Sequence, residues 1–182
     1  MKILETDRLI LREWNLDDVA DLYEYAKEPS VGPIAGWAPH KSIDESMLVL
    51  KSYIENDNAW AIELKGNKKV IGMVKIYPDQ NRGKYYAKQI NYALSPNYWG
   101  NGYMTEAIKR VVDFAFDDLK IDLLSVFHYP QNIRSKRVIE KCGFEYEGII
   151  KQGCTRYDAQ VFDAVCYSIL KDDWIKRRGE DL

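Results

Sequence analysis

The longest amphipathic segment of the chain lies between two segments with the pattern of β-strands. Its apolar residues recur at the i, i+3, i+4, i+7 spacing of a helix that buries one face. They are Met104, Ala107, Ile108, Val111, Val112, Ala115, Phe116 and Leu119. Strand patterns precede the segment from Tyr85 to Leu94 and follow it over residues 123–128. This order predicts a βαβ unit whose strands are parallel neighbours with a right-handed crossover.

Shorter patterns predict the rest of a mixed α/β sheet. Strands are expected at residues 8–12, 59–64, 70–76, 144–152 and 159–170. Helices are expected after an Asn15 cap, after a capping box of Ser42 and Glu45, and over residues 133–142. We therefore expect about six to seven strands, mostly antiparallel, and about four helices. They would form a single domain over residues 1–182, with a core at about residues 8–174.

Composition excludes several classes of protein. With 182 residues and 46% hydrophobic residues, the chain has enough apolar surface for one core, which excludes intrinsic disorder. The 26 Lys and Arg residues nearly balance the 28 Asp and Glu residues, so we expect neither direct nucleic-acid binding nor membrane binding. The three cysteines match no metal-ligand or redox spacing, so we expect reduced thiols and no metal. An early polar start and no apolar run of about 18 residues indicate a cytoplasmic protein.

A charge-free stretch covers residues 89–105 in a chain that is otherwise 30% charged. Its Gly100-Asn101-Gly102 turn precedes the main helix, whose first amides have no partner within the helix. These amides, together with roughly half a positive charge from the helix dipole, suit a phosphate group. The letters match neither a Walker loop nor a dinucleotide fingerprint. A tight turn that binds nothing is the alternative.

Residues 98–107, YWGNGYMTEA, resemble the acyl-CoA loop of the GCN5-related N-acetyltransferase (GNAT) superfamily. The similarity is to the branch of bacterial ribosomal-protein N-terminal acetyltransferases. It extends to residues 6–12, 39–42, 132–135, 140–144 and 167–174. The resemblance implies a GNAT fold, in which the central βαβ unit is splayed to admit acyl-CoA.

The resemblance also implies which residues bind acetyl-CoA. The pyrophosphate would lie on the backbone of Gly100, Asn101, Gly102, Tyr103, Met104 and Thr105. The pantetheine arm would pass Leu94 and Ser95, and Asn132 would hydrogen-bond it or the nearby backbone. From the residues alone, Asn132 is a helix N-cap.

Ser135 is the candidate catalytic residue. Its spacing to Val138, Ile139 and Cys142 places the hydroxyl on the buried face of a helix. The hydroxyl either bonds a backbone carbonyl one turn back or, as the resemblance implies, protonates the departing CoA thiolate. A water molecule is the alternative proton donor.

The general base is not identified by the pattern, because residues 151–154 hold no carboxylate where the branch sometimes has a Glu. Glu13, Glu147, Asp158 and His128 are the alternatives. Trp37, in a Pro/Gly-rich loop, either lines a substrate pocket or fills the space between helix and sheet.

The expected activity is an acetyl-CoA-dependent N-acetyltransferase whose acceptor amine, a protein N-terminus or a small amine, attacks the thioester directly. One alternative is an antibiotic or polyamine acetyltransferase, whose cationic acceptor would need clustered carboxylates. Asp17, Asp18, Asp44, Glu45 and Asp57 are candidates for that cluster. A second alternative is a non-catalytic, acyl-CoA-binding interaction protein. A homodimer is compatible with each of these functions.

Overall fold

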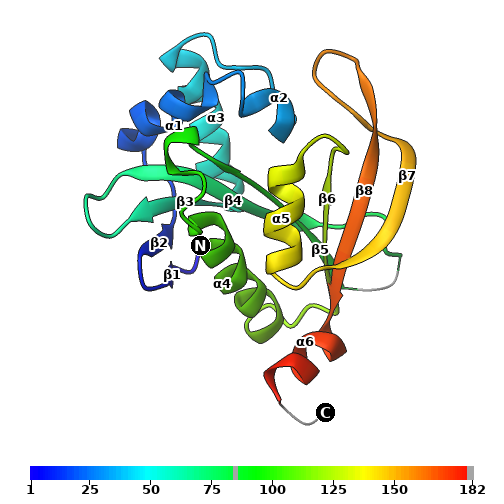
Figure 1. Cartoon of the computed structure of the whole chain (residues 1–182). Helices are drawn as coiled ribbons and strands as arrows, with labels where there is room; N and C mark the ends of the chain where they lie inside the picture. The colour runs from blue at the N-terminus through cyan, green and yellow to red at the C-terminus, as the bar shows by residue number, and fades with distance from the viewer. Residues whose placement is uncertain (84–85, 180–182) are drawn as a thin grey trace.

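A single eight-stranded sheet organises the molecule in the computed structural model, which describes residues 1–83 and 86–179. The expected start of the third strand at Tyr85 lies outside the described residues. The strands follow the order β1-β2-β3-β4-β5-β6-β8-β7 across the sheet (Figure 1). They are β1 (Leu4–Glu5), β2 (Leu9–Arg12), β3 (Ala59–Leu64), β4 (Val70–Pro78), β5 (Ala87–Leu94), β6 (Leu123–His128), β7 (Glu145–Thr155) and β8 (Val161–Leu170).

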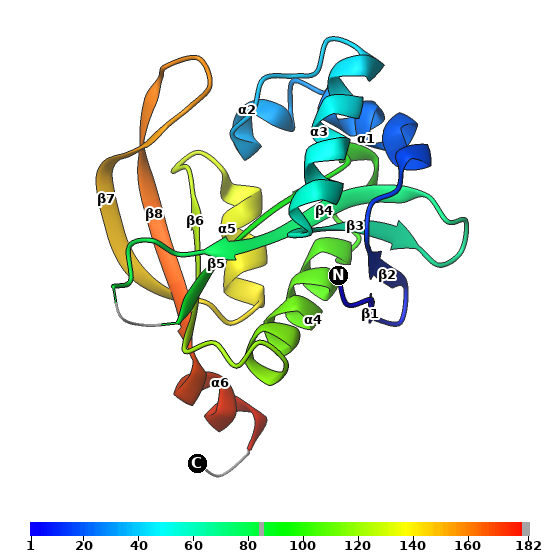
Figure 2. The same ribbon diagram turned by 180° about the vertical axis from the view of Figure 1, so that it is seen from behind.

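Helices cover both faces of this sheet (Figures 1 and 2). They are α1 (Val19–Ala26), α2 (Gly32–Ala35), α3 (Ile43–Asn56), α4 (Tyr103–Asp117), α5 (Ile133–Lys141) and α6 (Lys171–Arg178), with two 3₁₀ turns, η1 (Leu16–Asp18) and η2 (Pro96–Tyr98). One core packs α4 and α5 against one face, and a second core packs α1 and α3 against the other. No helix of the described residues is both long enough and apolar enough to span a membrane.

The strand and helix counts exceed the prediction, although the mixed and mostly antiparallel character is confirmed. The additional elements are short. The strand β1 has only two residues and the helix α2 only four, too few for a periodic pattern to show. The helix α6 has a single buried side chain, Trp174, so no apolar stripe in the sequence indicates this helix.

The predicted βαβ unit is present and is splayed. Among the described strands, β5 and β6 are the only parallel neighbours. They pair at Ala87 with Leu123, Lys88 with Leu124 and Gln89 with Ser125, and beyond these residues the two strands separate. On its other side β5 stays paired with β4 as far as Leu94. The βαβ unit is therefore closed at one end and split at the other.

The helix α4 positions the split because its buried face is anchored in the core. All of the predicted stripe is buried except Leu119, which follows the end of the helix and is half-buried.

The expected capping box at α3 is only half formed. Ser42 Oγ accepts from the Glu45 amide at 3.2 Å, whereas Glu45 Oε2 accepts from the Lys41 amide, one residue before the cap.

Candidate functional site

A cavity of about 410 Å³ occupies the split between β5 and β6. Apolar and aromatic residues of both strands form its walls, the start of α4 and the inner face of α5 close one side, and α2 borders another. The lining includes Val31, Ile34, Ile90, Tyr92, Leu94, Trp99, Met104, Val126, Phe127, His128, Tyr129, Ser135 and Val138. The place where two parallel strands diverge is thus also the place where the molecule is hollow.

The turn before α4 presents unpaired backbone amides to this cavity. Gly100 and Gly102 have φ angles of +81° and +80°, in the left-handed region that favours glycine. Gly102 is the N-cap of α4, and no side chain caps this helix. The amides of Tyr103, Met104 and Thr105 therefore lack intrahelical partners and can donate to an anion.

Side chains of the N-terminal segment hold this turn in place. Glu106 accepts from Arg8 Nε at 2.7 Å and from Thr6 Oγ1 at 2.6 Å. Burial raises the pKa of Glu106, but these hydrogen bonds outweigh it and keep the pKa below its usual value. Arg8 also donates to the carbonyl of Asn101 at 3.0 Å, and its guanidinium lies 4.4 Å above the Tyr103 ring. The turn is therefore held by contacts within the protein itself.

Most of the predicted acetyl-CoA residues line the cavity, although their roles remain predictions. Leu94, Gly100, Gly102, Tyr103, Met104, Thr105 and Asn132 are in its lining, and so is the candidate catalytic residue Ser135. Ser95 and Asn101 are not. The buried Ser95 donates its amide to the Ile71 carbonyl at 2.8 Å, and the Asn101 side chain folds back onto the Trp99 carbonyl at 3.1 Å. The Ser95 amide thus continues the pairing with β4, and the Asn101 side chain stabilises the turn.

The Ser135 hydroxyl has a partner that sequence reasoning missed. Its Oγ lies 2.8 Å from the hydroxyl oxygen of Tyr92 on β5, rather than bonding a carbonyl one turn back. Burial raises the pKa of Tyr92, so the phenol keeps its proton. The Asn132 side chain accepts from the Ser135 amide at 3.0 Å, which confirms the predicted cap. Alternation along β5 places Tyr92 on the face of Ile90 and Leu94, but only the fold brings that face to α5.

His128 presents a bare nitrogen in the same cavity lining. Its Nδ1 lies 2.8 Å from the Tyr129 carbonyl oxygen, and a carbonyl can only accept, so Nδ1 carries the proton. In the neutral imidazole, the other ring nitrogen, Nε2, is then an acceptor. It is buried and has no hydrogen-bond partner among the described residues, and the whole residue is 4% exposed. A buried acceptor in this state suits an N–H group of a bound molecule.

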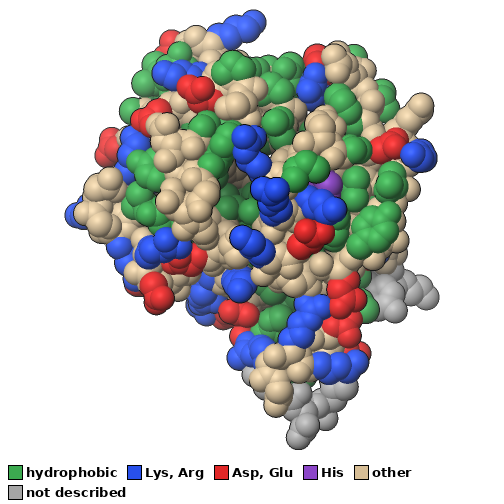
Figure 3. Space-filling view, viewed as in Figure 1, with side chains coloured by type: hydrophobic (Ala, Val, Ile, Leu, Met, Phe, Trp, Pro, Cys, Tyr) green, Lys and Arg blue, Asp and Glu red, His purple; other side chains and the backbone are tan. Residues whose placement is uncertain are grey.

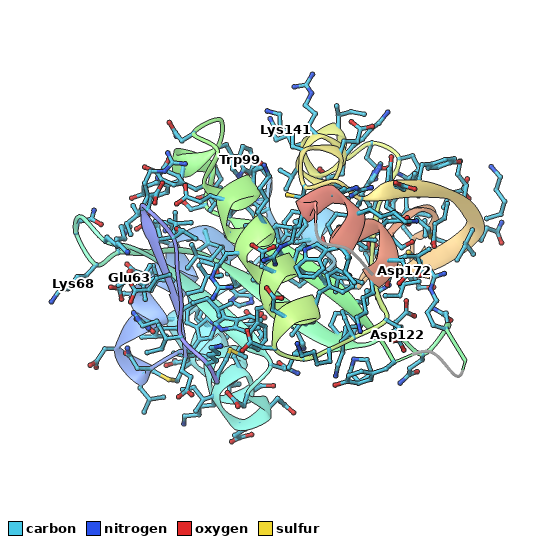
Figure 4. All side chains as sticks on the ribbon, turned by 90° about the horizontal axis from the view of Figure 1, so that it is seen from below. Glu63, Lys68, Trp99, Asp122, Lys141 and Asp172 are labelled. Carbon is cyan, nitrogen blue, oxygen red and sulfur yellow. The ribbon has the colours of Figure 1, made fainter. Side chains whose placement is uncertain are left out.

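The charged residues of the cavity are all cationic. Arg134, Arg137 and Lys141 of α5 belong to its lining, and no Asp or Glu of the described ranges does. The Arg134 guanidinium stacks 4.3 Å from the centre of the Trp99 ring, while Trp99 Nε1 donates to the Leu94 carbonyl at 2.9 Å. Figure 4 labels Trp99, which precedes α4, and Lys141, the last residue of α5, and Lys and Arg side chains gather near the centre of the face in Figure 3. The cavity suits a polyanion with an apolar arm.

The carboxylates weighed from the sequence lie elsewhere. Glu13 bonds the N-terminal amine, Glu147 pairs with Arg82, and Asp158 pairs with Arg156. In the acidic group weighed for a cationic acceptor, Asp18 is held by both terminal nitrogens of Arg12 at 2.8 Å. Trp37 packs in the core with α1 and α3 and is not part of the cavity lining.

Comparison with known proteins gives the family. The model of the acetyltransferase (GNAT) domain matches residues 8–145. The chain is 28% identical to the uncharacterized N-acetyltransferase YoaA of Bacillus subtilis over 90% of this chain and 96% of that protein. It is 25% identical to the [ribosomal protein uS5]-alanine N-acetyltransferase of Escherichia coli over 96% of this chain and 94% of that protein.

Solved structures have the same fold. A GNAT-family acetyltransferase from Bacillus anthracis superposes with a TM-score of 0.84 at 20% identity, covering 94% of this chain and 99% of that one. The microcin C7 self-immunity acetyltransferase MccE, solved with acetyl-CoA and AMP, gives a TM-score of 0.77 at 21% identity and covers 91% and 93%. The splayed sheet, the amide-lined turn and the match over most of the sequence agree: the chain belongs to the GNAT acetyltransferase family and is an N-acetyltransferase.

Proposed function

We propose that this enzyme transfers the acetyl group of acetyl-CoA to a protein N-terminal amine within one ternary complex. The observation that carries the proposal is the continuity of one cavity. Its lining includes residues at the start of α4, residues of the open edge of β5, and Ser135 and His128. A pyrophosphate, an extended arm and a thioester would meet these three features in order.

The split strand provides hydrogen bonds for the pantetheine arm. Beyond Gln89 the β6-facing edge of β5 has no strand partner, so its backbone groups are available to the amides of the arm. At the outer end, Arg134, Arg137 and Lys141 supply positive charge for the phosphates. The residues present therefore fit acetyl-CoA as the cosubstrate.

Transfer then requires two proton movements at the thioester. The neutral amine attacks the carbonyl carbon, forming the C–N bond, and His128 Nε2 accepts the proton that the nitrogen loses. The C–S bond breaks, and Ser135 Oγ, hydrogen-bonded to Tyr92, donates a proton to the thiolate. One proton thus passes from the amine to His128 and one from Ser135 to the sulfur, and the enzyme returns to its starting state when His128 releases its proton to solvent and Ser135 takes one up.

The composition of the cavity favours an N-terminal amine over a polyamine or an aminoglycoside. A multiply charged cation would find no carboxylate in the described lining to bind its charges. The similarity to a ribosomal-protein alanine N-acetyltransferase supports the same acceptor class.

An acceptor screen tests the proposal. Purified protein is mixed with acetyl-CoA and with N-terminal peptides, small monoamines, polyamines or aminoglycosides, and thiol release and product mass are recorded. We expect acetylated peptides and at least about tenfold slower reaction with polyamines. Faster reaction with polyamines would overturn the acceptor. Tight acetyl-CoA binding without any acetyl transfer would instead indicate a non-catalytic acyl-CoA-binding protein.

A further inference from the structure

A second hollow adjoins the cavity on the opposite face of the sheet from α4 and α5. It has a volume of about 340 Å³ and is lined by Asn58, Lys75, Tyr77 and Asn91. Asn91 also lines the cavity of the split, so the two spaces share a wall. Lys75 and Asn91 are register partners on β4 and β5. The next pair on the same face, Met73 and Ala93, is buried beneath α1 and α3. The hollow therefore begins where the helices stop covering this face.

Lys75 brings a positive charge to this hollow without a matching negative charge. The side chain is half-buried, and no carboxylate of the described residues lies within ion-pair distance. Its Nζ lies 5.9 Å from the centre of the Tyr77 ring. An ammonium without an ion-pair partner on the wall of a hollow can bind an anion through charge-assisted hydrogen bonds.

Asn58 supplies the complementary polar group. Its Oδ1 is buried and has no hydrogen-bond partner among the described residues. The phenol of Tyr77 donates to Gln89 Oε1 at 2.7 Å, so its proton is not available to Asn58. The hollow thus holds an unpaired cation and a buried acceptor oxygen, which together fit a molecule with both a carboxylate and an N–H group.

We propose that this hollow is the acceptor subsite, and that it selects amines that also carry a carboxylate. Lys75 binds the carboxylate, Asn58 Oδ1 accepts an N–H of the same molecule, and Asn91 forms the wall that it shares with the transfer cavity. The inference rests on the proposed acetyl transfer and narrows its substrate class. Two sources share this chemistry: an N-terminal segment with an Asp or Glu side chain, and a free amino acid.

Matched acceptors test the subsite. Amidated peptides with an N-terminal alanine carry Glu at one of positions 2 to 5, and each is compared with its Gln counterpart, while free glutamate is compared with free glutamine. In the wild type we expect kcat/KM to be about tenfold higher for a Glu peptide at one position. A preference confined to glutamate would identify the free amino acid as the source.

Substitutions assign the preference to Lys75. Lys75→Met should abolish the preference, so that the Glu and Gln peptides of each pair react at the same rate, and Lys75→Glu should invert it in favour of Lys peptides. Lys51→Met, on the exposed side of α3, is the matched control and should behave as the wild type. Equal rates for every Glu and Gln pair, or an unchanged preference in Lys75→Glu, would overturn the subsite.

A binding measurement separates this inference from the activity. The same acceptors are titrated into the enzyme saturated with coenzyme A, where no transfer can occur. Tighter binding of the Glu peptide that Lys75→Met removes supports the subsite even if no acceptor is acetylated. Acetyl transfer to Glu and Gln peptides alike, with equal binding, refutes the subsite and leaves the proposed function intact. Equal binding of the Glu and Gln peptides without acetyl transfer to either also refutes the subsite.

Discussion

At the split, one neighbouring group fixes the proton position of His128, and another fixes the orientation of the Ser135 hydroxyl. The Tyr129 carbonyl fixes the proton of His128 on Nδ1, and the Tyr92 hydroxyl orients Ser135. The sequence predicted that Ser135 faces inward, because helical spacing carries that information. It did not predict Tyr92 as the partner or the bare nitrogen of His128, because both depend on contacts between separate elements.

Replacement of Ser135 tests the proton donor. Ser135→Ala should lower kcat about tenfold and leave the Kd for acetyl-CoA nearly unchanged, because the hydroxyl acts on the leaving thiolate and not on the bound cosubstrate. Single-turnover thiol release and calorimetry measure the two quantities. Ser52→Ala, on α3 and remote from the cavity, is the control. An unchanged kcat would remove Ser135 from the mechanism.

Replacement of His128 tests the acceptor nitrogen. His128→Phe fills the space but removes Nε2, so kcat/KM for the amine should fall about 100-fold, within the usual range for a general base. His128→Gln restores an acceptor oxygen and should recover part of the loss, whereas a purely structural role would favour the Phe variant. Thermal unfolding of both variants reports any loss of stability. Equal activity of the Phe variant and the wild type would contradict the assignment.

At the scale of elements, the turn before α4 and the divergence of β5 from β6 define the site. The apolar periodicity of α4 was sufficient to predict the βαβ unit, since one face of that helix is continuously buried. Pattern could not show where the two strands stop pairing, because the residues of β5 after Gln89 continue the strand pattern and remain paired with β4. The splay was expected only from family resemblance.

The left-handed turn gives a prediction for glycine. Gly102→Ala adds a Cβ that contacts only Arg8 Nη2, at 3.5 Å, so strain arises from the positive φ and not from a clash. The substitution should cost about 1 kcal/mol in the free energy of unfolding and weaken acetyl-CoA binding severalfold as the turn relaxes. Gly66→Ala, where an added Cβ meets nothing within 4 Å, should leave binding unchanged. Equal binding by both variants would argue against the amide-lined turn.

A polar cluster joins the β4–β5 connection to the far strands. Arg82 bridges Asp79 and Glu147, which also accept from Ser125 and Ser168. Burial raises the pKa of each carboxyl, but the hydrogen bonds from Ser125 and Arg82 to Asp79, and from Arg82 and Ser168 to Glu147, outweigh it and lower both pKa values. Carboxyls with lowered pKa values stabilise the folded state above their unfolded pKa and lose that contribution as pH falls.

Removal of Arg82 tests this cluster. Arg82→Met should lower the free energy of unfolding by about 1 kcal/mol at neutral pH, because both carboxylates lose their cation. As pH falls and the carboxyls protonate, the difference between variant and wild type should shrink. Urea unfolding near pH 7 and near pH 3 measures it. A deficit that stayed constant with pH would mean that packing, and not charge, is responsible.

Across the whole molecule, positive charge is concentrated at the cavity of the split. The net charge of −2 does not reveal this, because Arg134, Arg137 and Lys141 gather at the cavity while the described carboxylates lie outside its lining. The charge-free stretch of residues 89–105 contributes most of β5 and the turn before α4. Backbone amides there serve a polyanion, and the cations come from α5, about thirty residues later in the chain.

The central claim is that acetyl-CoA occupies the split between β5 and β6. Calorimetric titration of acetyl-CoA into the wild type and into Val138→Trp tests it most directly, because this half-buried residue of α5 lines the cavity and a Trp there would fill it. Circular dichroism verifies that the variant is folded. We predict one site per chain in the wild type and no measurable binding in the folded variant. Equal affinity in both proteins would contradict the account.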